Sequence, residues 1–416
     1  MSELIIHGGN PLVGTLPVQG AKNSVLPLLA ATLLTDEPCV LHNCPTISDV
    51  TISREILTHL GCFVREEGHT VTVDANGVSR FDIPETLMRQ MRSSIVFLGA
   101  IISRTGEAHM SAPGGCELGN RPIDLHLMAL RRLGVEVKEC GGFLDCRCAR
   151  LCGCEIALTF PSVGATENIL LASVLADGTT TIRNAAREPE IIDLAAFLNE
   201  MGADIRCAGE STVIIRGTEK LHGCVHRVMP DRIAAATYLA AAAATNGDLT
   251  LTQMNPEHLT PILHLFTEMG CRVTATRNTC RLVAPKRLLA APGVRTMPYP
   301  GFPTDAQAPL MAAATVANGT TVFIESIFDS RYKHVAELNR LGAHIRTDGR
   351  TAVVCGVDHL TGASVECTDL RGGAALLIAG LAADGETRIS KLHHLDRGYD
   401  HPEEQLSRLG GAIRRI

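Results

Sequence analysis

A leucine or methionine followed by glycine recurs along the whole chain and constrains its fold more than any other feature. The glycines of this pattern are Gly61, Gly134, Gly202, Gly270, Gly342 and Gly410, and successive ones are 68 to 73 residues apart. Each follows a helical pattern, where a glycine with positive φ ends a helix at little cost. A period of this length, kept through all 416 residues, predicts six copies of one supersecondary structure.

Each repeat has the same order of sequence patterns. An apolar run rich in Ala and Leu ends in a turn such as Asp177-Gly178 or Asn318-Gly319, and a β-branched segment, a second helix, the glycine and another strand follow. The sequence therefore predicts an α/β protein. Repeats can stack into a solenoid, but repeats this long usually carry a fold of their own. We expect two domains of three repeats each, with helices inside, sheets outside and a boundary near residues 223–230.

The composition disfavours several classes of protein. The net charge is −6 and no long run of Lys or Arg occurs, which argues against a nucleic-acid partner. The N-terminal residues lack the basic start and apolar run of a signal peptide, and the most apolar stretch, 234–244, is about half as long as a membrane span. Fifteen Cys without a secretion signal are typical of a reducing compartment. We therefore expect a cytoplasmic protein with no membrane partner.

Four of the cysteines form a C-x-C-x₃-C-x-C pattern, namely Cys146, Cys148, Cys152 and Cys154. This spacing differs from that of the common zinc motifs. Because residues two apart on a strand share a face, the same positions fit a β-hairpin. We favour the hairpin over a metal cluster.

Charged residues stand in equivalent places in the repeats, at the start of the apolar helix. Lys22, Arg92, Arg232, Asp305 and Arg371 take this place, and Gly164 takes it in the third repeat. A helix N-terminus attracts anions, whereas a cation there opposes the helix dipole. One such cation would be an ordinary surface charge, but several in phase favour a shared anion site.

The most irregular segment of the second repeat is 113–122, with the sequence PGGCELGNRP. Its glycines permit a lid motion, and a thiol on such a loop can act as an acid or a nucleophile. One cysteine among fifteen is more often a small core residue. The flanking glycines nevertheless make Cys116 a candidate catalytic residue, and Arg121 could hold an anionic substrate.

These segments together resemble the UDP-N-acetylglucosamine 1-carboxyvinyltransferases, a family of enolpyruvyl transferases. The resemblance covers essentially the whole chain and includes Arg331. The matching segments are GAKN (20–23), MRS (91–93), PGGC (113–116), RPIDLH (121–126), SVGAT (162–166), NAAREPE (184–190), PDRI (230–233), FPTD (302–305), DLR (369–371) and DRGY (396–399).

The resemblance implies two inside-out α/β barrel domains, each of three repeats, with the active site in the interdomain cleft. Residues 1–21 would include an N-terminal strand that packs with the C-terminal domain, 22–229 would form the first domain with the Cys116 loop as a lid, and 230–416 the second. The implied reaction transfers the enolpyruvyl group of phosphoenolpyruvate to the 3-hydroxyl of UDP-N-acetylglucosamine by addition and elimination, and phosphate leaves. This is the first committed step of peptidoglycan precursor biosynthesis. The resemblance implies no cofactor, no metal and no obligatory protein partner.

The resemblance also implies roles for single residues. Cys116 would protonate carbon 3 of phosphoenolpyruvate, Asp305 would accept the proton of the sugar hydroxyl, and Lys22 and Arg397 would complete the catalytic set. The residues implied in substrate binding are Lys22, Asn23, Arg92, Arg121, Pro122, Ile123, Asp124, Leu125, Ser162, Val163, Asp305, Ile327, Arg331, Arg371 and Arg397.

Two other functions are compatible with the same fold. A sister enzyme of aromatic biosynthesis shares it, but the Cys116 loop and segment 121–126 argue against that enzyme. A paralogue of weak activity could bind a UDP-sugar as a regulator or scaffold. The intact set of Lys22, Cys116, Asp305 and Arg397 argues against this second alternative.

Overall fold

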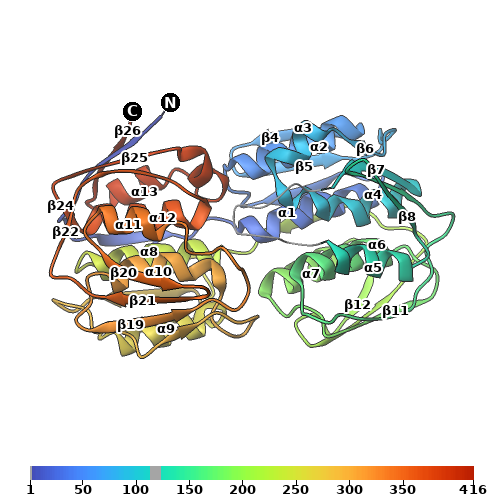
Figure 1. Ribbon diagram of the computed structural model, residues 1–416. Helices are drawn as coiled ribbons and strands as arrows, with labels where there is room; N and C mark the ends of the chain where they lie inside the picture. The colour runs from blue at the N-terminus through green and yellow to red at the C-terminus, as the bar shows by residue number, and fades with distance from the viewer. Residues whose placement is uncertain (1, 113–122) are drawn as a thin grey trace. The chain divides into compact units, whose positions relative to one another are not determined.

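Each repeat contributes one apolar helix to the interior of the protein (Figure 1). The computed structural model describes residues 2–112 and 123–416, except for the side chain of Arg92. The chain divides into an N-terminal unit, residues 20–112 and 123–229, and a C-terminal unit, residues 2–19 and 230–416. Each unit has a hydrophobic core of its own.

The centre of the N-terminal unit consists of α1 (Lys22–Ala31), α4 (Phe97–Thr105) and α6 (Val163–Ser173). Nine residues of α1, nine of α6 and the first six of α4 are buried, so these helices form the core of the unit. The 3₁₀ helices η1 (Thr32–Leu34) and η2 (Arg92–Val96) follow α1 and precede α4. The outer helices are α2 (Ser48–Leu60), α3 (Glu85–Gln90), α5 (Asp124–Arg132) and α7 (Pro189–Glu200).

Three four-stranded sheets complete the N-terminal unit. The first sheet contains, in strand order, β14 (Val225–Arg227), β3 (Cys39–His42), β5 (Thr70–Asp74) and β4 (Phe63–Glu67). The second contains β6 (Asp82–Ile83), β7 (Glu107–Ser111), β9 (Phe143–Arg147) and β8 (Glu136–Cys140). The third contains β10 (Glu155–Ala157), β11 (Thr179–Arg183), β13 (Thr212–Arg216) and β12 (Asp204–Arg206). In each sheet the first two strands are parallel and the others pair antiparallel. The three sheets therefore share one topology.

The C-terminal unit is built in the same way around α8 (Arg232–Ala244), α10 (Gln307–Ala314) and α12 (Leu370–Ala382). All 13 residues of α8 are buried, and eight of them are alanine, a small residue that lets helices approach closely. The 3₁₀ helix η4 (Thr304–Ala306) leads into α10. The remaining helices are η3 (Pro256–Leu259), α9 (Thr260–Glu268), α11 (Val335–Arg340), η5 (Leu392–Arg397) and α13 (Pro402–Arg408).

The sheets of the C-terminal unit need strands from the start of the chain. The first sheet contains, in strand order, β16 (Arg272–Ala275), β17 (Thr279–Val283), β15 (Asp248–Thr252) and β2 (Val13–Pro17). The second contains β18 (Val294–Arg295), β19 (Thr320–Ile324), β21 (Thr351–Cys355) and β20 (His344–Asp348). The third contains β23 (Ser364–Glu366), β25 (Glu386–Ser390), β1 (Leu4–His7) and β26 (Ala412–Arg415). A short pair, β22 (Leu360–Thr361) and β24 (Ala383–Asp384), accompanies them. β2 pairs parallel with β15, and β1 lies antiparallel between β25 and β26.

The chain passes between the units twice, near residues 19–21 and again near 229–231. Within the N-terminal unit, the amide of Ala21 donates a hydrogen bond of 2.8 Å to the carbonyl of Met229. Within the C-terminal unit, the amide of Asp231 donates one of 2.8 Å to the carbonyl of Gln19. In each unit, the residue beside the first passage is thus hydrogen-bonded to the residue beside the second passage.

The six repeat glycines all adopt positive φ, between 90° and 106°, at the ends of outer helices, as the sequence predicts. One of the expected first-helix turns differs from the others. In Asn246-Gly247 the asparagine takes the left-handed conformation, with φ of 55°, instead of the glycine. The repeats also contain more strands than predicted. A two-stranded hairpin follows five of the six repeat glycines, whereas Gly410 is followed by β26, which pairs with β1.

Among residues 2–112 and 123–416, no helix is both long and apolar enough to cross a bilayer.

Candidate functional site

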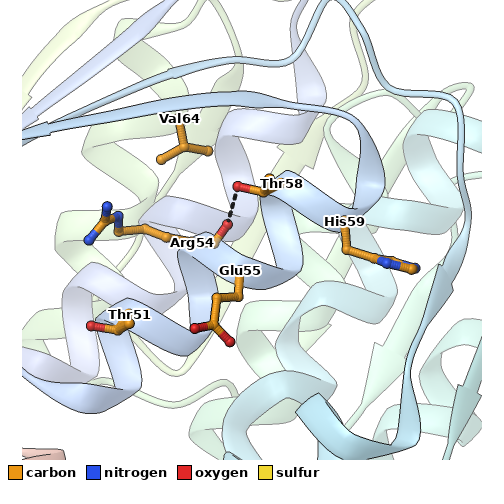
Figure 2. Close-up of a pocket in the computed structure, with 6 residues that line it drawn as sticks. All are labelled: Thr51, Arg54, Glu55, Thr58, His59 and Val64. Atoms are coloured by element: carbon orange, nitrogen blue, oxygen red, sulfur yellow. Dashed lines mark hydrogen bonds between the residues drawn. The ribbon is translucent and has the colours of Figure 1, made fainter.

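A hollow on the N-terminal unit lies beside α2 and β4. It is lined by Thr51, Arg54, Glu55, Thr58, His59 and Val64 (Figure 2). Inside the helix, the Thr58 hydroxyl donates a hydrogen bond of 2.9 Å to the Arg54 carbonyl, and the Arg54 guanidinium forms an ion pair with Glu66. These are ordinary surface interactions, and the lining residues do not overlap with the predicted site residues.

The predicted helix-start residues do lie at the starts of inner helices. Lys22 and Arg232 are the first residues of α1 and α8, and Arg371 is the second residue of α12. Arg92 begins η2, and Asp305 lies in η4. The spacing of the repeats therefore located these positions correctly.

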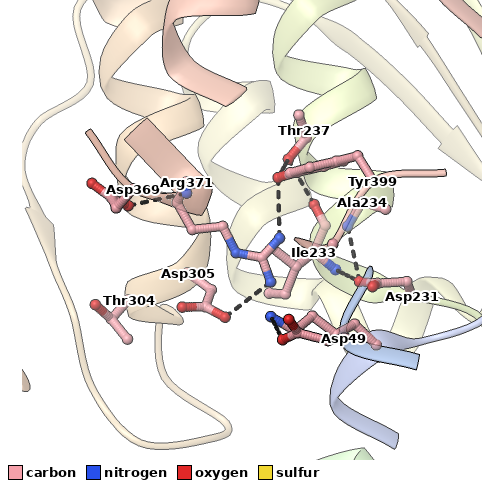
Figure 3. A network of polar contacts seen from close by, with 12 residues as sticks. Asp49, Asp231, Ile233, Ala234, Thr237, Thr304, Asp305, Asp369, Arg371 and Tyr399 are labelled. Atoms are coloured by element: carbon pink, nitrogen blue, oxygen red, sulfur yellow. Dashed lines mark hydrogen bonds and ion pairs between the residues drawn. The ribbon is translucent and has the colours of Figure 1, made fainter. Parts of the chain in front are cut away.

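Asp305 is held by two arginines of the C-terminal unit, Arg331 and Arg371. Figure 3 shows its contact with Arg371. One carboxylate oxygen lies 3.0 Å from Nη2 of Arg331, and the other lies 3.0 Å from Nη2 of Arg371. Nη2 of Arg331 also donates to the carbonyl of Thr304 at 3.1 Å. The arginine side chains are 2% and 3% exposed, whereas that of Asp305 is 26% exposed. The partly exposed carboxylate is thus held in place by two buried cations.

Arg371 is in turn held by Tyr399. Its Nη1 donates to the phenol oxygen at 3.1 Å, the same oxygen lies 2.8 Å from the Thr237 hydroxyl, and the guanidinium carbon is 5.5 Å from the ring centroid. Burial alone would lower the pKa of Arg371, but Tyr399, Asp305 and Asp231 raise it above its ordinary value. Arg371 therefore remains a cation, and its direction is set by the phenol and by Asp305.

Two aspartates cap inner helices of the C-terminal unit. Asp231 accepts hydrogen bonds from the amides of Ile233 and Ala234 at 2.8 and 2.9 Å, and Asp369 accepts from those of Arg371 and Gly372 at 3.0 Å each. Burial alone would raise the pKa of Asp369, but Arg331, His334 and its hydrogen bonds lower it. These carboxylates thus satisfy the first free amides of α8 and α12 and hold the two helix starts in place.

The start of α1 has a different arrangement. Nζ of Lys22 lies 2.9 Å from a carboxylate oxygen of Asp49, and the two side chains are 9% and 0% exposed (Figure 3). The N-cap residue of α1, Ala21, makes no side-chain capping bond. Lys22 is therefore a nearly buried cation that is paired with a buried carboxylate.

The other described residues predicted to bind substrate are distributed over both units. Ser162 caps α6 by accepting from the amide of Ala165 at 3.4 Å, and Val163 begins that helix. Asp124 begins α5 and is exposed, while Asn23, Ile123 and Leu125 are half-buried. In the C-terminal unit, Ile327 and Arg397 are half-buried, and the amide of Ile327 donates to Glu325 at 2.8 Å.

Three predicted residues, Cys116, Arg121 and Pro122, lie outside the described residues, as does the side chain of Arg92. Their predicted roles remain predictions.

Sequence reasoning missed the residues that support the site. Asp49, Thr237 and Tyr399 received no role, although each contacts a predicted site residue or its partner. An aspartate one or two residues before an arginine, in Asp231-Arg232 and Asp369-Leu370-Arg371, is a helix-cap signal that was available. The contacts of Asp49 and Tyr399 had no such signal, because they join segments far apart in the sequence.

Of the four cysteines in the C-x-C-x₃-C-x-C pattern, only Cys146 lies in a strand, namely β9, and it is 1% exposed. Cys148, Cys152 and Cys154 lie outside the strands and are not buried, so the predicted hairpin is correct for Cys146 alone. The sulfur atoms of Cys148 and Cys154 contact the carbonyls of Gly134 and Arg132. Within the described parts of the chain, no group of three or more His, Cys, Asp or Glu side chains is placed to hold a metal ion.

Comparisons with known proteins agree with this architecture. A family model described as "EPSP synthase (3-phosphoshikimate 1-carboxyvinyltransferase)" matches residues 6–406. The chain is 50% identical over 416 residues, covering 100% of both chains, to "UDP-N-acetylglucosamine 1-carboxyvinyltransferase 2" of Caldanaerobacter subterraneus subsp. tengcongensis. It is also 50% identical over 418 residues to "UDP-N-acetylglucosamine 1-carboxyvinyltransferase 1" of Symbiobacterium thermophilum, covering 99% of this chain and 95% of the relative.

Solved structures show the same fold. The enolpyruvyl transferase NikO from Streptomyces tendae is 30% identical, with a TM-score of 0.89 over 100% of this chain and 99% of that one. An EPSP synthase from Acinetobacter baumannii is 19% identical, with a TM-score of 0.76 over the whole of both chains. The second likeness shows the fold alone.

Proposed function

From the premise that this chain belongs to the EPSP synthase family of enolpyruvyl transferases, we propose that its acceptor is UDP-N-acetylglucosamine. The chain transfers the enolpyruvyl group of phosphoenolpyruvate to the 3-hydroxyl of the sugar and releases phosphate. This reaction begins the synthesis of peptidoglycan precursors. The observation that carries the proposal is full-length identity of 50% to two proteins named for this activity.

The proposed chemistry requires three proton transfers, one from the sugar hydroxyl, one to carbon 3 of phosphoenolpyruvate and one from carbon 3 in the elimination. Addition puts a proton on carbon 3 of phosphoenolpyruvate and joins the sugar oxygen to carbon 2, and elimination then removes a proton from carbon 3 and expels phosphate. We assign the proton added to carbon 3 to Cys116 and the acceptor of the sugar hydroxyl proton to Asp305. Asp305 suits this role because Arg331 and Arg371 bind its two oxygens while its side chain remains 26% exposed. These arginines orient the carboxylate toward the hydroxyl.

The substrates carry charges that the predicted cations can neutralise. Phosphoenolpyruvate has a phosphate and a carboxylate, and we assign these to Lys22, Arg121 and Arg397, with Arg371 and Arg331 close behind Asp305. Lys22 enters as a cation already paired with Asp49. An arriving anion would compete with Asp49 for the ammonium group.

The sugar nucleotide would contact a second set of residues, which shares Arg121 with phosphoenolpyruvate. We assign Asn23, Arg92, Ser162, Val163, Asp305 and Ile327 to the sugar and diphosphate, and segment 121–125 to the uridine. Two small substrates are then the partners that the reaction needs, without nucleic acid, membrane or a second protein. A cytoplasmic location fits both substrates and the fifteen cysteines.

The sister reaction on shikimate 3-phosphate is the second candidate, because the family model is described by that activity. Phosphate release from phosphoenolpyruvate, measured with each acceptor in turn, separates the two. We expect release with UDP-N-acetylglucosamine and a background rate with shikimate 3-phosphate. The reverse pattern would replace the proposal by the sister activity, and a background rate with both would favour a binding protein.

A further inference from the structure

The first turn of α1 carries two predicted substrate-binding residues, Lys22 and Asn23, yet it lacks the usual means of holding a helix start. Its N-cap residue, Ala21, makes no side-chain capping bond, and no acidic residue lies in the first turn. Lys22 itself opposes the helix dipole. Some other interaction must therefore fix this turn.

Two carboxylates from neighbouring outer helices contact the turn. Asp49 of α2 pairs with the ammonium group of Lys22 at 2.9 Å. Asp193 of α7 accepts a hydrogen bond from the hydroxyl of Ser24, which is fully buried. The first turn of α1 is thus held on one side through Lys22 and on another side through Ser24.

Asp193 also holds the end of the N-terminal unit. The Asp193 oxygen that accepts the Ser24 hydrogen bond also accepts one of 3.2 Å from the amide of Met229. The carbonyl of Met229 in turn accepts a hydrogen bond of 2.8 Å from the amide of Ala21. One carboxylate therefore contacts the segment that enters α1 and the segment that leaves the unit. A change at Asp193 would reach Lys22 by both routes.

A buried histidine fixes the carboxylate itself. Nε2 of His226 lies 3.1 Å from the other oxygen of Asp193, and Nδ1 lies 2.8 Å from a carboxylate oxygen of Glu200. The His226 side chain is 8% exposed, and the edge of the Phe197 ring packs against it. Burial would lower the pKa of His226, but its hydrogen bonds to Asp193 and Glu200 raise it. The contact of Nε2 with Asp193 thus favours the protonated imidazole and holds this carboxylate in place.

We propose that Asp193 is a positioning residue that sets the place of Lys22 and Asn23 through Ser24 and Met229. This role rests on the proposed function, which assigns those two residues to substrate. Asp193 does not contact substrate in this account. Its loss lets the first turn of α1 shift, while the Lys22–Asp49 pair and the rest of the helix remain.

The test uses Ser24→Ala and Asp193→Asn, with Ser173→Ala and Asp82→Asn as controls. Ser173 is a buried serine of the inner helix α6, and Asp82 pairs with His59 at 3.0 Å in the same unit. We expect the KM for phosphoenolpyruvate to rise about tenfold in Ser24→Ala, the usual effect of losing one charge-assisted hydrogen bond. The kcat at saturating substrate should change less than threefold. The controls should keep the KM of the unmodified protein.

A double variant separates positioning from general destabilisation. If Asp193 acts mainly through Ser24, the KM of the double variant should equal that of Asp193→Asn alone, whereas independent effects would multiply. Unchanged KM values in both single variants, with only a lower melting temperature, would overturn the proposal.

Hydrogen exchange supplies a readout that does not depend on activity. Amides in the first two turns of α1 should exchange faster in Ser24→Ala than in Ser173→Ala. If the unmodified protein lacks enolpyruvyl transfer but this exchange difference is present, the proposed function fails and the hold of Asp193 on α1 stands. Equal exchange in the two variants would contradict that hold.

Discussion

The two units place different chemistry at equivalent inner-helix starts. In the C-terminal unit, Asp305 is bound by two buried arginines, one of which belongs to the start of α12. In the N-terminal unit, Lys22 at the start of α1 is bound by one buried aspartate. The signs are reversed: an acid held by cations in one unit, and a cation held by an acid in the other.

The supporting contacts differ in the same way. Side-chain carboxylates cap α8 and α12, whereas α1 has no such cap and depends on Asp49 and Asp193 from outer helices. The repeats therefore share the position of the site residues at helix starts, but not the charge of these residues or the contacts that hold them. We infer that the C-terminal unit supplies the proton acceptor and the N-terminal unit supplies a cation for the anionic substrate.

The largest effect is expected for Asp305→Asn, which keeps the size and removes the base. Turnover should fall by roughly two to four orders of magnitude, the usual contribution of a general base. Binding of UDP-N-acetylglucosamine, measured by calorimetry, should persist. Near-normal turnover would break the comparison, because the proton acceptor would then lie elsewhere.

Arg397→Ala should have the next largest effect. Removing a cation assigned to phosphoenolpyruvate should raise the KM for that substrate by about 10- to 100-fold. Steady-state kinetics at saturating UDP-N-acetylglucosamine measure this rise. A rise confined to the KM for the sugar nucleotide would reassign Arg397 to the other substrate.

Tyr399→Phe tests the support of the acid in the C-terminal unit. The variant leaves Nη1 of the buried Arg371 without its phenol partner, which should lower the free energy of unfolding by about 1–3 kcal/mol. Urea titration measures the loss. Tyr332→Phe is the matched control in the same unit, since the Tyr332 hydroxyl donates to two carbonyls at 3.2 Å. This control should lower the free energy of unfolding by less, because water can replace the Tyr332 hydroxyl. Equal costs would show that Arg371 does not need the phenol.

Glu167 tests the N-terminal unit through pH. Burial, followed by the charges of Glu190 and Glu188, raises the pKa of Glu167 from 4.5 to about 8. The folded protein therefore holds a proton that the unfolded chain releases, so this group lowers stability progressively as pH rises from about 4.5 to about 8. Glu167→Gln should melt higher than the unmodified protein at pH 8 and at a similar temperature at pH 5. A difference that does not depend on pH would refute the raised pKa.

The smallest effect is expected at a repeat glycine. A Cβ at Gly342 would lie 3.9 Å from the nearest atom, the amide nitrogen of Thr361, so Gly342→Ala should cost only the conformational strain of a φ of 90°, about 1–2 kcal/mol. At Gly61 a Cβ would lie 2.3 Å from the carbonyl oxygen of Gly77, and Gly61→Ala should cost more. Thermal melts compare the two. Equal costs would mean that the equivalent turns tolerate a side chain equally.

Much of the fold could be predicted because it is encoded locally. The repeat glycines and the apolar helices predicted the α/β repeats with helices inside, and the family match and the NikO structure confirm the enolpyruvyl transferase fold and family. The positions of Lys22, Arg371 and Asp305 at helix starts also followed from spacing. The hairpin strands were missed because their short alternating segments give a weak signal beside the helices.

The support of the site could not be predicted from spacing. Asp49 lies on the outer helix α2 and Asp193 on α7, and nothing in their sequence surroundings indicates a partner on α1. Tyr399 reaches Arg371 and Thr237, which are 28 and 162 residues away. Such contacts depend on how the elements pack, and one sequence does not contain that information.

The most direct test measures phosphate release by Asp305→Asn and Lys22→Gln side by side over a range of phosphoenolpyruvate concentrations. If the units supply a proton acceptor and a cation, added phosphoenolpyruvate should restore much of the rate of Lys22→Gln and none of the rate of Asp305→Asn. The split would appear as a raised KM in one variant and a lowered kcat in the other. The same response in both variants would contradict the division of roles between the units.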